Sequence, residues 1–181
     1  MLPTTELESW SDGNDAFGRT GVIGIEGGIA SSRMLSLRAE LAYARPEIVE
    51  RAVYYDWGEN RTAWVPNHNS LLIASTAVVL APPVGVAGVR PFGSLGVGAK
   101  FYRFHATSGG DVVVPFASDQ VAPMVTAGAG VRFPILSWRL SVEAQSLVSR
   151  FERYPDHPSS TARWQNDMTV SAGVEVPLHR R

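Results

Sequence analysis

The residues of this chain that suit metal binding or nucleophilic chemistry are scattered rather than grouped. No two histidines have the i, i+4 spacing of a zinc-binding helix, and no cysteine is present to join them. Carboxylates that suit calcium occur in predicted loops, but none has the DxDxDG spacing of a calcium loop. We therefore predict no metal and no cofactor. The residues considered are His68, His105, His157, His179, Asp111, Asp119 and Asp156.

Nine charged residues follow a different pattern, because each stands singly among small residues in a segment of alternating polarity. Five acids against four bases nearly balance, which favours ion pairing in a cramped interior over catalysis. The sequence "GVGAK" (96–100) lies in one of these segments and lacks the GxxxxGK[ST] spacing of a phosphate loop. We predict that these nine residues form a structural network inside the fold: Glu26, Arg38, Glu40, Lys100, Arg132, Arg139, Glu143, Asp167 and Glu175.

The elements that must position these charges are predicted β-strands. In "NDMTVSAGVEV" (166–176), apolar and polar or small residues alternate strictly, which is typical of a strand with two different faces. Segment 70–80, "SLLIASTAVVL", is apolar on both faces, so its orientation is left open. Seven strands are predicted in all, at 21–30, 35–43, 70–80, 93–102, 121–133, 138–148 and 166–176.

The connections between these strands alternate in length. Short ones at 31–34, 81–88 and 134–137 alternate with long ones at 46–69, 105–120 and 152–165. This rhythm is typical of an up-and-down antiparallel sheet with its short turns at one end. Within the first long connection, residues 46–57 fit either a short helix or an outward continuation of the second strand.

Composition limits the classes of protein that need to be considered. The 181 residues suffice for one domain, and 45% hydrophobic with 18% charged residues argues against disorder. A net charge of −1 without a basic run gives no reason to expect nucleic acid as a partner. No apolar run is long enough for a transmembrane helix, and "MLPTTELESW" is unlike a secretory signal. Lys100 is the single lysine, and arginine suits packed ion pairs better.

The polar face of the strands decides which face is expected to be buried. A soluble sheet would carry lysine, glutamate, threonine and glutamine on that face, whereas here it is mostly glycine, serine, alanine and threonine around the single charges. Aromatic residues gather at both predicted ends of the strands, as in the aromatic belts of membrane proteins. The pattern favours a membrane barrel with a polar interior over a soluble barrel. The aromatic residues are Tyr54, Tyr55, Trp57, Phe101, Tyr102, Phe104, Phe151, Tyr154 and Trp164 at one end, and Phe92, Phe133 and Trp138 at the other.

Four stretches of the chain carry a family resemblance: "SLRAELAYA", "RPFGSLGVGAKFYRF", "AGAGVRFP" and "SVEAQSLVSRF…RWQNDMTVSAGVEV". In these stretches the chain resembles small bacterial outer-membrane β-barrel proteins of the OmpA/OmpX-like group. The resemblance covers about residues 20–178. It implies an eight-stranded barrel in the bacterial outer membrane, with outer-membrane lipid and the barrel-assembly machinery as partners. The chain departs from the group at its end, because "VPLHRR" lacks the terminal aromatic residue that the insertion machinery reads.

Three functions are compared on this basis. The first is a non-enzymatic outer-membrane barrel with an essentially closed lumen, whose long loops serve adhesion, surface recognition or envelope integrity. The alternative is a soluble or periplasmic lipocalin-like barrel that binds a ligand against an inward apolar face. The second alternative is a lipid-modifying enzyme, because "HPS" (157–159) is similar to the His-x-Ser of outer-membrane lipid A deacylases, whose histidine acts as a general base.

The odd number of predicted strands leads to an expectation about the start of the chain. Single-chain outer-membrane barrels have an even number of strands, whereas seven are predicted here. The interpretation divides the chain into an outer-loop segment at 1–19, a barrel domain at 20–178 and a tail at 179–181. We expect Met1 to be a misassigned or engineered start, with the missing strand ending near residues 2–3 and preceded by a signal peptide.

Overall fold

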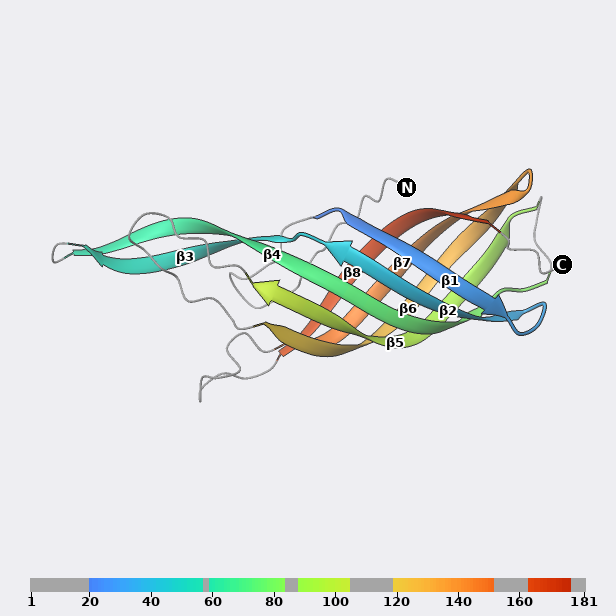
Figure 1. The fold of residues 1–181 in the computed structure, drawn as a ribbon, viewed down its shortest axis with the longest axis horizontal. Coiled ribbons are helices and arrows are strands. Elements are labelled where there is room, and N and C mark those ends of the chain that lie inside the picture. Colours follow the sequence, from blue (N-terminus) through green and yellow to red (C-terminus); the bar gives the residue numbers. More distant parts are fainter. Residues whose placement is uncertain (1–19, 57–58, 84–87, 105–118, 152–162, 177–181) are drawn as a thin grey trace.

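The computed structural model of the protein describes residues 20–56, 59–83, 88–104, 119–151 and 163–176. All regular structure in these ranges is β (Figure 1). None of the described residues belongs to a helix long and apolar enough to cross a membrane. The strands are β1 (Val22–Ala30), β2 (Leu35–Ala44), β3 (Glu47–Asp56), β4 (Glu59–Leu80), β5 (Arg90–Phe104), β6 (Gln120–Ile135), β7 (Trp138–Phe151) and β8 (Arg163–Glu175).

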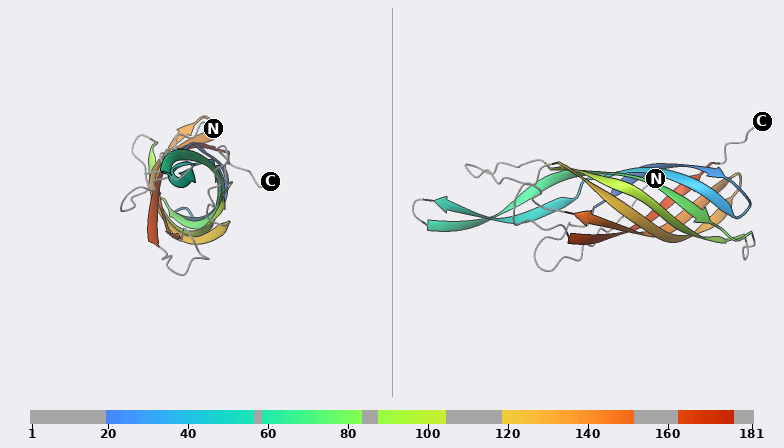
Figure 2. Two further views of the ribbon diagram at one scale, coloured as in Figure 1. Left: turned by 90° about the vertical axis from the view of Figure 1, so that its left-hand side faces the viewer. Right: turned by 90° about the horizontal axis from the view of Figure 1, so that it is seen from below.

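Seven of these strands form one continuous antiparallel sheet in the order β1-β2-β4-β5-β6-β7-β8. Each strand pairs with the one before it, and the direction reverses at every step. The sheet curls so strongly that its strands surround a common interior in the end view (Figure 2, left). The predicted all-β, up-and-down antiparallel fold is confirmed.

The connection predicted at 46–69 is wrong, because most of it is a paired hairpin. β3 pairs with the first half of β4, and Glu47–His68 continues the register of Ala44–Leu71 between β2 and β4. β2 and β3 are therefore one strand in register, interrupted at Pro46, which has no N–H to give to the ladder. Of the two interpretations of residues 46–57, the outward strand is correct. The β3–β4 hairpin projects from the sheet as an arm (Figure 1; Figure 2, right).

The two faces of the curled sheet differ sharply in chemistry. On β5, Leu95 and Val97 are 64% and 61% exposed, whereas Ser94 before them and Lys100 after them are 7% and 0% exposed. Large apolar side chains cover the outer face, and small or polar side chains fill much of the inner face. The exposed aliphatic residues on the strands include Ile23, Ile25, Ile29, Leu37, Leu41, Leu72, Val78, Leu80, Val121, Val125, Val170 and Val174.

Segment 70–80, whose orientation the sequence left open, is part of β4 and contributes apolar side chains to the interior. Leu71 and Ile73 of β4 are buried with Met124 and Leu147 in the hydrophobic cluster of the interior. These residues lie towards the long-loop end, which we define as the end where β1, β4, β6 and β8 enter the sheet. The interior is therefore partly apolar at this end.

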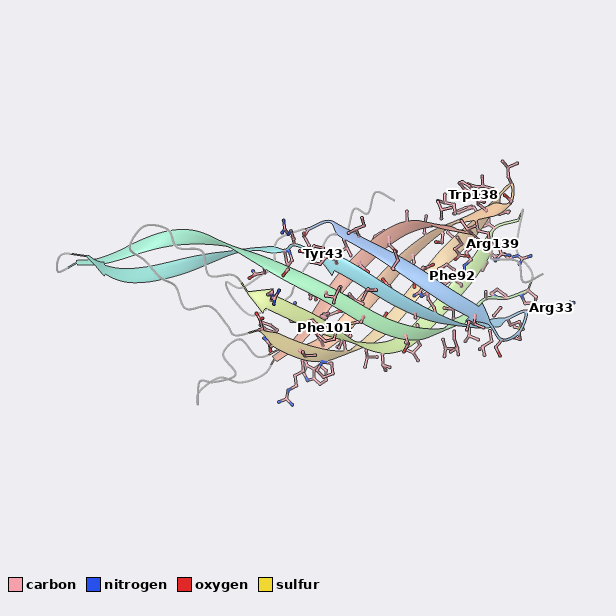
Figure 3. All side chains as sticks on the ribbon, viewed as in Figure 1. Arg33, Tyr43, Phe92, Phe101, Trp138 and Arg139 are labelled. Atoms are coloured by element: carbon pink, nitrogen blue, oxygen red, sulfur yellow. The ribbon has the colours of Figure 1, made fainter. Side chains whose placement is uncertain are left out.

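Aromatic residues lie both inside and outside the sheet. Phe101 and Trp138 are exposed near opposite ends of the strands (Figure 3), and Trp164 is also exposed. Tyr102 and Phe92 are buried, so their predicted place in outward belts is wrong. They occupy the inward positions of β5, next to outward Phe101 and Pro91. The side chains of the other aromatic residues predicted at the long-loop end lie outside the described residues. These are Tyr54, Tyr55, Trp57, Phe104 and Tyr154.

Candidate functional site

A buried ion pair between Arg38 and Glu143 crosses the interior from β2 to β7. Arg38 lies between outward Leu37 and Ala39, so strand alternation points its side chain inward. Both Nη atoms of Arg38 donate to the carboxylate of Glu143, with Nη2 at 2.9 Å from Oε1. The two side chains are 7% and 9% exposed. Ser94 of β5 donates its hydroxyl to Glu143 Oε1 at 2.7 Å, so the carboxylate is held by three donors.

A second pair joins Lys100 of β5 to Asp167 of β8. The ammonium Nζ of Lys100 lies 2.6 Å from Asp167 Oδ2 and also donates to the Leu147 carbonyl and the Ser149 hydroxyl, both at 3.0 Å. The other carboxylate oxygen of Asp167 accepts from Gln165 Nε2 at 2.8 Å. Both charged side chains are almost fully buried, at 0% and 1% exposed. All three protons of the ammonium thus have an acceptor.

The third pair lies nearer the short-turn end, where the connections at 31–34 and 136–137 join the strands. Arg132 Nε of β6 donates to Glu175 Oε1 of β8 at 2.7 Å. The guanidinium carbon of Arg132 lies 4.4 Å from the centre of the Phe92 ring, which is a cation–π distance. The two charged side chains are 17% and 21% exposed, so this pair is wetter than the other two.

The partners in all three pairs belong to strands that are not neighbours in the sheet. They connect β2 with β7, β5 with β8, and β6 with β8. Each bond therefore spans the concave side of the sheet and opposes its uncurling. Removing one partner from such a pair leaves an uncompensated buried charge, which is strongly destabilising. The geometry fits structural cross-bracing of the interior.

Three of the nine predicted charges are not members of these three pairs, although Glu26 contacts one of them. Glu26 of β1 is 37% exposed, with Oε2 3.7 Å from Arg38 Nη1. Glu40 of β2 is half-buried and directly opposite Glu26 in the register of the two strands. Arg139 is exposed at the start of β7 (Figure 3). The structure thus brings eight of the nine to the concave side and leaves Arg139 at the rim.

Sequence reasoning missed the uncharged members of this network, namely Ser94, Ser149, Gln165 and Leu147 through its carbonyl. The signal for Ser94 was available, because it is a polar residue at an inward position of an alternating segment. Ser149 and Gln165 lie just outside the strands predicted at 138–148 and 166–176, which are longer in the structure. Their partners lie on strands that are distant in sequence, so nothing local indicated which charge each residue contacts.

A hollow of about 60 Å³ lies on the concave side between β1 and β8. Its wall is mixed. Carboxylates and neutral polar groups (Glu26, Glu40, Glu143, Gln145, Thr169 and Ser171) alternate with glycine and apolar residues (Val22, Gly24, Ile25, Ala42, Ile73 and Leu147). The amide nitrogen of Gln145 is buried and has no hydrogen-bond partner among the described residues. The hollow is large enough for a few water molecules.

The described part of the chain contains no group of three or more histidine, cysteine, aspartate or glutamate side chains placed to hold a metal ion. His157, Ser159, Asp111, Asp156, His105 and His179 lie outside the described residues, as does the side chain of His68. Asp119 is exposed and forms a 3.5 Å ion pair with Arg103 at the long-loop end.

Comparisons of the chain with family models, curated proteins and solved structures found no match.

Proposed function

We propose that this protein is a small bacterial outer-membrane β-barrel whose charge-filled lumen is essentially closed. The observation that carries the proposal is the distribution of polarity, with exposed aliphatic side chains outside and buried charges inside. An aliphatic side chain left in water forgoes about 1.5–3 kcal/mol relative to full burial. Exposure of a whole aliphatic face therefore favours lipid as the surrounding solvent. A lipocalin-like barrel would instead turn that face inward.

The lengths of the strands fit this environment. A transmembrane β-strand needs about 9–11 residues at a tilt of about 45°. β1 and β2 have 9 and 10 residues, and β8 has 13. Trp138 near the short-turn end, and Phe101 and Trp164 near the long-loop end, are exposed at heights suitable for the two membrane interfaces.

The cross-bracing charges argue for a structural barrel rather than a wide pore. Side chains fill an eight-stranded interior almost completely, and here ion pairs cross it at three levels. The partners of the barrel are then outer-membrane lipid and the barrel-assembly machinery, and no enzymatic activity is proposed. Biological recognition falls to the long-loop end, where the β3–β4 arm of about ten residue pairs extends by roughly 30 Å. Adhesion or surface recognition is the role that suits such an arm.

Val97→Arg tests the proposal directly. Val97 lies at the middle of β5 with its side chain 61% exposed on the outer face. In lipid vesicles an arginine near the bilayer midplane should lower the free energy of unfolding by about 2–4 kcal/mol. Val97→Leu is the matched control and should leave it nearly unchanged. The measurement is urea unfolding in vesicles followed by tryptophan fluorescence. A monodisperse, folded monomer in detergent-free buffer, equally stable with arginine at position 97, would overturn the proposal.

A further inference from the structure

The two edges of the sheet run in the same direction. β1 and β8 are the first and the seventh strand of the path, and direction reverses at every step between them. Among the described residues β1 pairs only with β2, and β8 only with β7. Direct closure between β1 and β8 would therefore require a parallel pair in an otherwise antiparallel sheet. A strand that runs the opposite way would be antiparallel to both edges.

A second copy of the chain does not supply such a strand. Two copies inserted in the same orientation present four edges that all run in one direction, so any pairing between the copies is again parallel. Residues 1–19 contain Arg19 as their single basic residue and show no aliphatic alternation. We define the seam as the two edge strands β1 and β8 that face each other across the open side of the sheet. Neither a second copy nor residues 1–19 provides the strand that fits it.

The seam specifies that chemistry through its charges. Glu26 and Glu40 are directly opposite each other on β1 and β2, where like charges repel. Arg38 is the cation beside them. Both of its Nη atoms donate to Glu143, and Nη1 also lies 3.7 Å from Glu26, so one guanidinium is shared between these carboxylates. The hollow beside the seam thus has three carboxylates and one guanidinium on or near its wall. Glu26 is 37% exposed and accessible from the open edge.

We propose that the seam between β1 and β8 binds an extended strand, antiparallel to both, with a basic side chain directed at Glu26 and Glu40. The inference rests on the proposed membrane location. The strand has about 9–11 residues, enough to cross the hydrocarbon layer. Its outward side chains are aliphatic and extend the exposed surface formed by Ile25 and Val170. Apart from the basic residue, its inward side chains are small. Its backbone pairs with edge groups that lipid cannot satisfy.

The test uses two cysteines placed across the seam of a chain that has none. Ile25 and Val170 are exposed, and residues adjacent to both line the same hollow, so they lie at similar heights. In Ile25→Cys/Val170→Cys, direct closure would bring the two α-carbons to within about 7 Å, and a disulfide would form under mild oxidation. An intervening strand separates them by two strand spacings, about 10 Å, which prevents the disulfide.

The probe is the peptide VSVTVRVSVTV, whose central arginine shares a face with serine and threonine, and the control is VSVTVEVSVTV. Each is added while the double-cysteine chain folds into lipid vesicles. We expect the arginine peptide to reduce intramolecular disulfide formation at least five-fold and to increase the inserted fraction, with a much weaker effect of the glutamate peptide. Glu26→Gln/Glu40→Gln in the same background should abolish the difference between the peptides.

Three outcomes would overturn the inference. Equal disulfide formation with and without the arginine peptide would show that β1 and β8 close directly. Disulfide-linked dimers that persist with the peptide would identify a second copy as the occupant. Equal action of the two peptides would remove the role of Glu26 and Glu40. In all three cases the chain still inserts, so the proposed function stands, whereas a chain that stays out of vesicles with either peptide contradicts both.

Discussion

The fully buried pair of Lys100 and Asp167 gives the sharpest test of the interior. Asp167→Ala removes the carboxylate that lies 2.6 Å from the Lys100 ammonium. The Leu147 carbonyl and the Ser149 hydroxyl remain as acceptors, but neither carries the compensating charge. The ammonium is 0% exposed, so water does not reach it without local opening of the sheet. Breaking such a pair costs about 3–5 kcal/mol.

The matched control is the exposed pair of Arg103 and Asp119. Its atoms are 3.5 Å apart, with side chains 69% and 60% exposed. A solvent-exposed ion pair contributes about 0–1 kcal/mol, so Asp119→Ala should hardly change the free energy of unfolding. Both substitutions remove the same functional group from a strand-end or strand position, and burial is the main difference between them. The comparison therefore isolates the dry environment of Lys100.

The assay is urea unfolding of the protein reconstituted in lipid vesicles. Asp167→Ala should shift the midpoint far below that of Asp119→Ala. Lys100→Met/Asp167→Leu should recover most of the loss, because a well-packed apolar pair avoids the desolvation of two charges. Equal midpoints for Asp167→Ala and Asp119→Ala would refute the assignment of Lys100 and Asp167 to a dry interior.

Two further predictions concern the Arg38–Glu143 ion pair and the orientation of the barrel. Glu143→Ala leaves Arg38 without its bidentate partner and should cost about 3–5 kcal/mol where the pair is dry, whereas the nearby Ser141→Ala should cost little; equal urea midpoints in vesicles would mean that these charges face water. On intact cells that export the protein, Asp119→Cys at the long-loop end should react with a membrane-impermeant maleimide and Arg33→Cys at the short-turn end should not. The opposite labelling would place the β3–β4 arm on the inner side of the membrane and contradict a surface role.

Strand positions and the side of each residue were predictable from the sequence because strand geometry is local. Side chains alternate with a period of two whatever the partner strand is, so "GSLGVGAK" predicted Ser94 and Lys100 on the face opposite Leu95 and Val97. The same rule failed for 70–80, since a segment apolar on both faces carries no signal about orientation. Only pairing with β2 and β5 determines that Leu71 and Ile73 face inward.

Ion-pair partners were not predictable, because they depend on how the sheet curls. Arg38 was expected to belong to a network of charges in the interior, without an assigned partner. In the structure, both Nη atoms of Arg38 donate hydrogen bonds to Glu143, which is 105 positions away in the chain. β2 faces β7 because of the pairing register between neighbouring strands and the curvature of the whole sheet. Neither property can be read from a single segment of the sequence. For Phe92 and Tyr102 the local pattern was informative, because both share the face of Ser94 and Lys100 on β5; the expectation of an aromatic belt overlooked this alternation.

The open seam and the cross-bracing charges have a common consequence for stability. Hydrogen bonds between neighbouring strands hold the sheet together but do not by themselves fix its curl. The curl is held by the pairs that link β2 with β7 and β5 with β8, and both pairs exist with no β1–β8 ladder among the described residues. A closing strand therefore binds to a nearly preformed site, which lowers the ordering cost of binding. It follows that substitutions at Asp167 should weaken strand capture at the seam even though Asp167 lies outside the wall of the hollow.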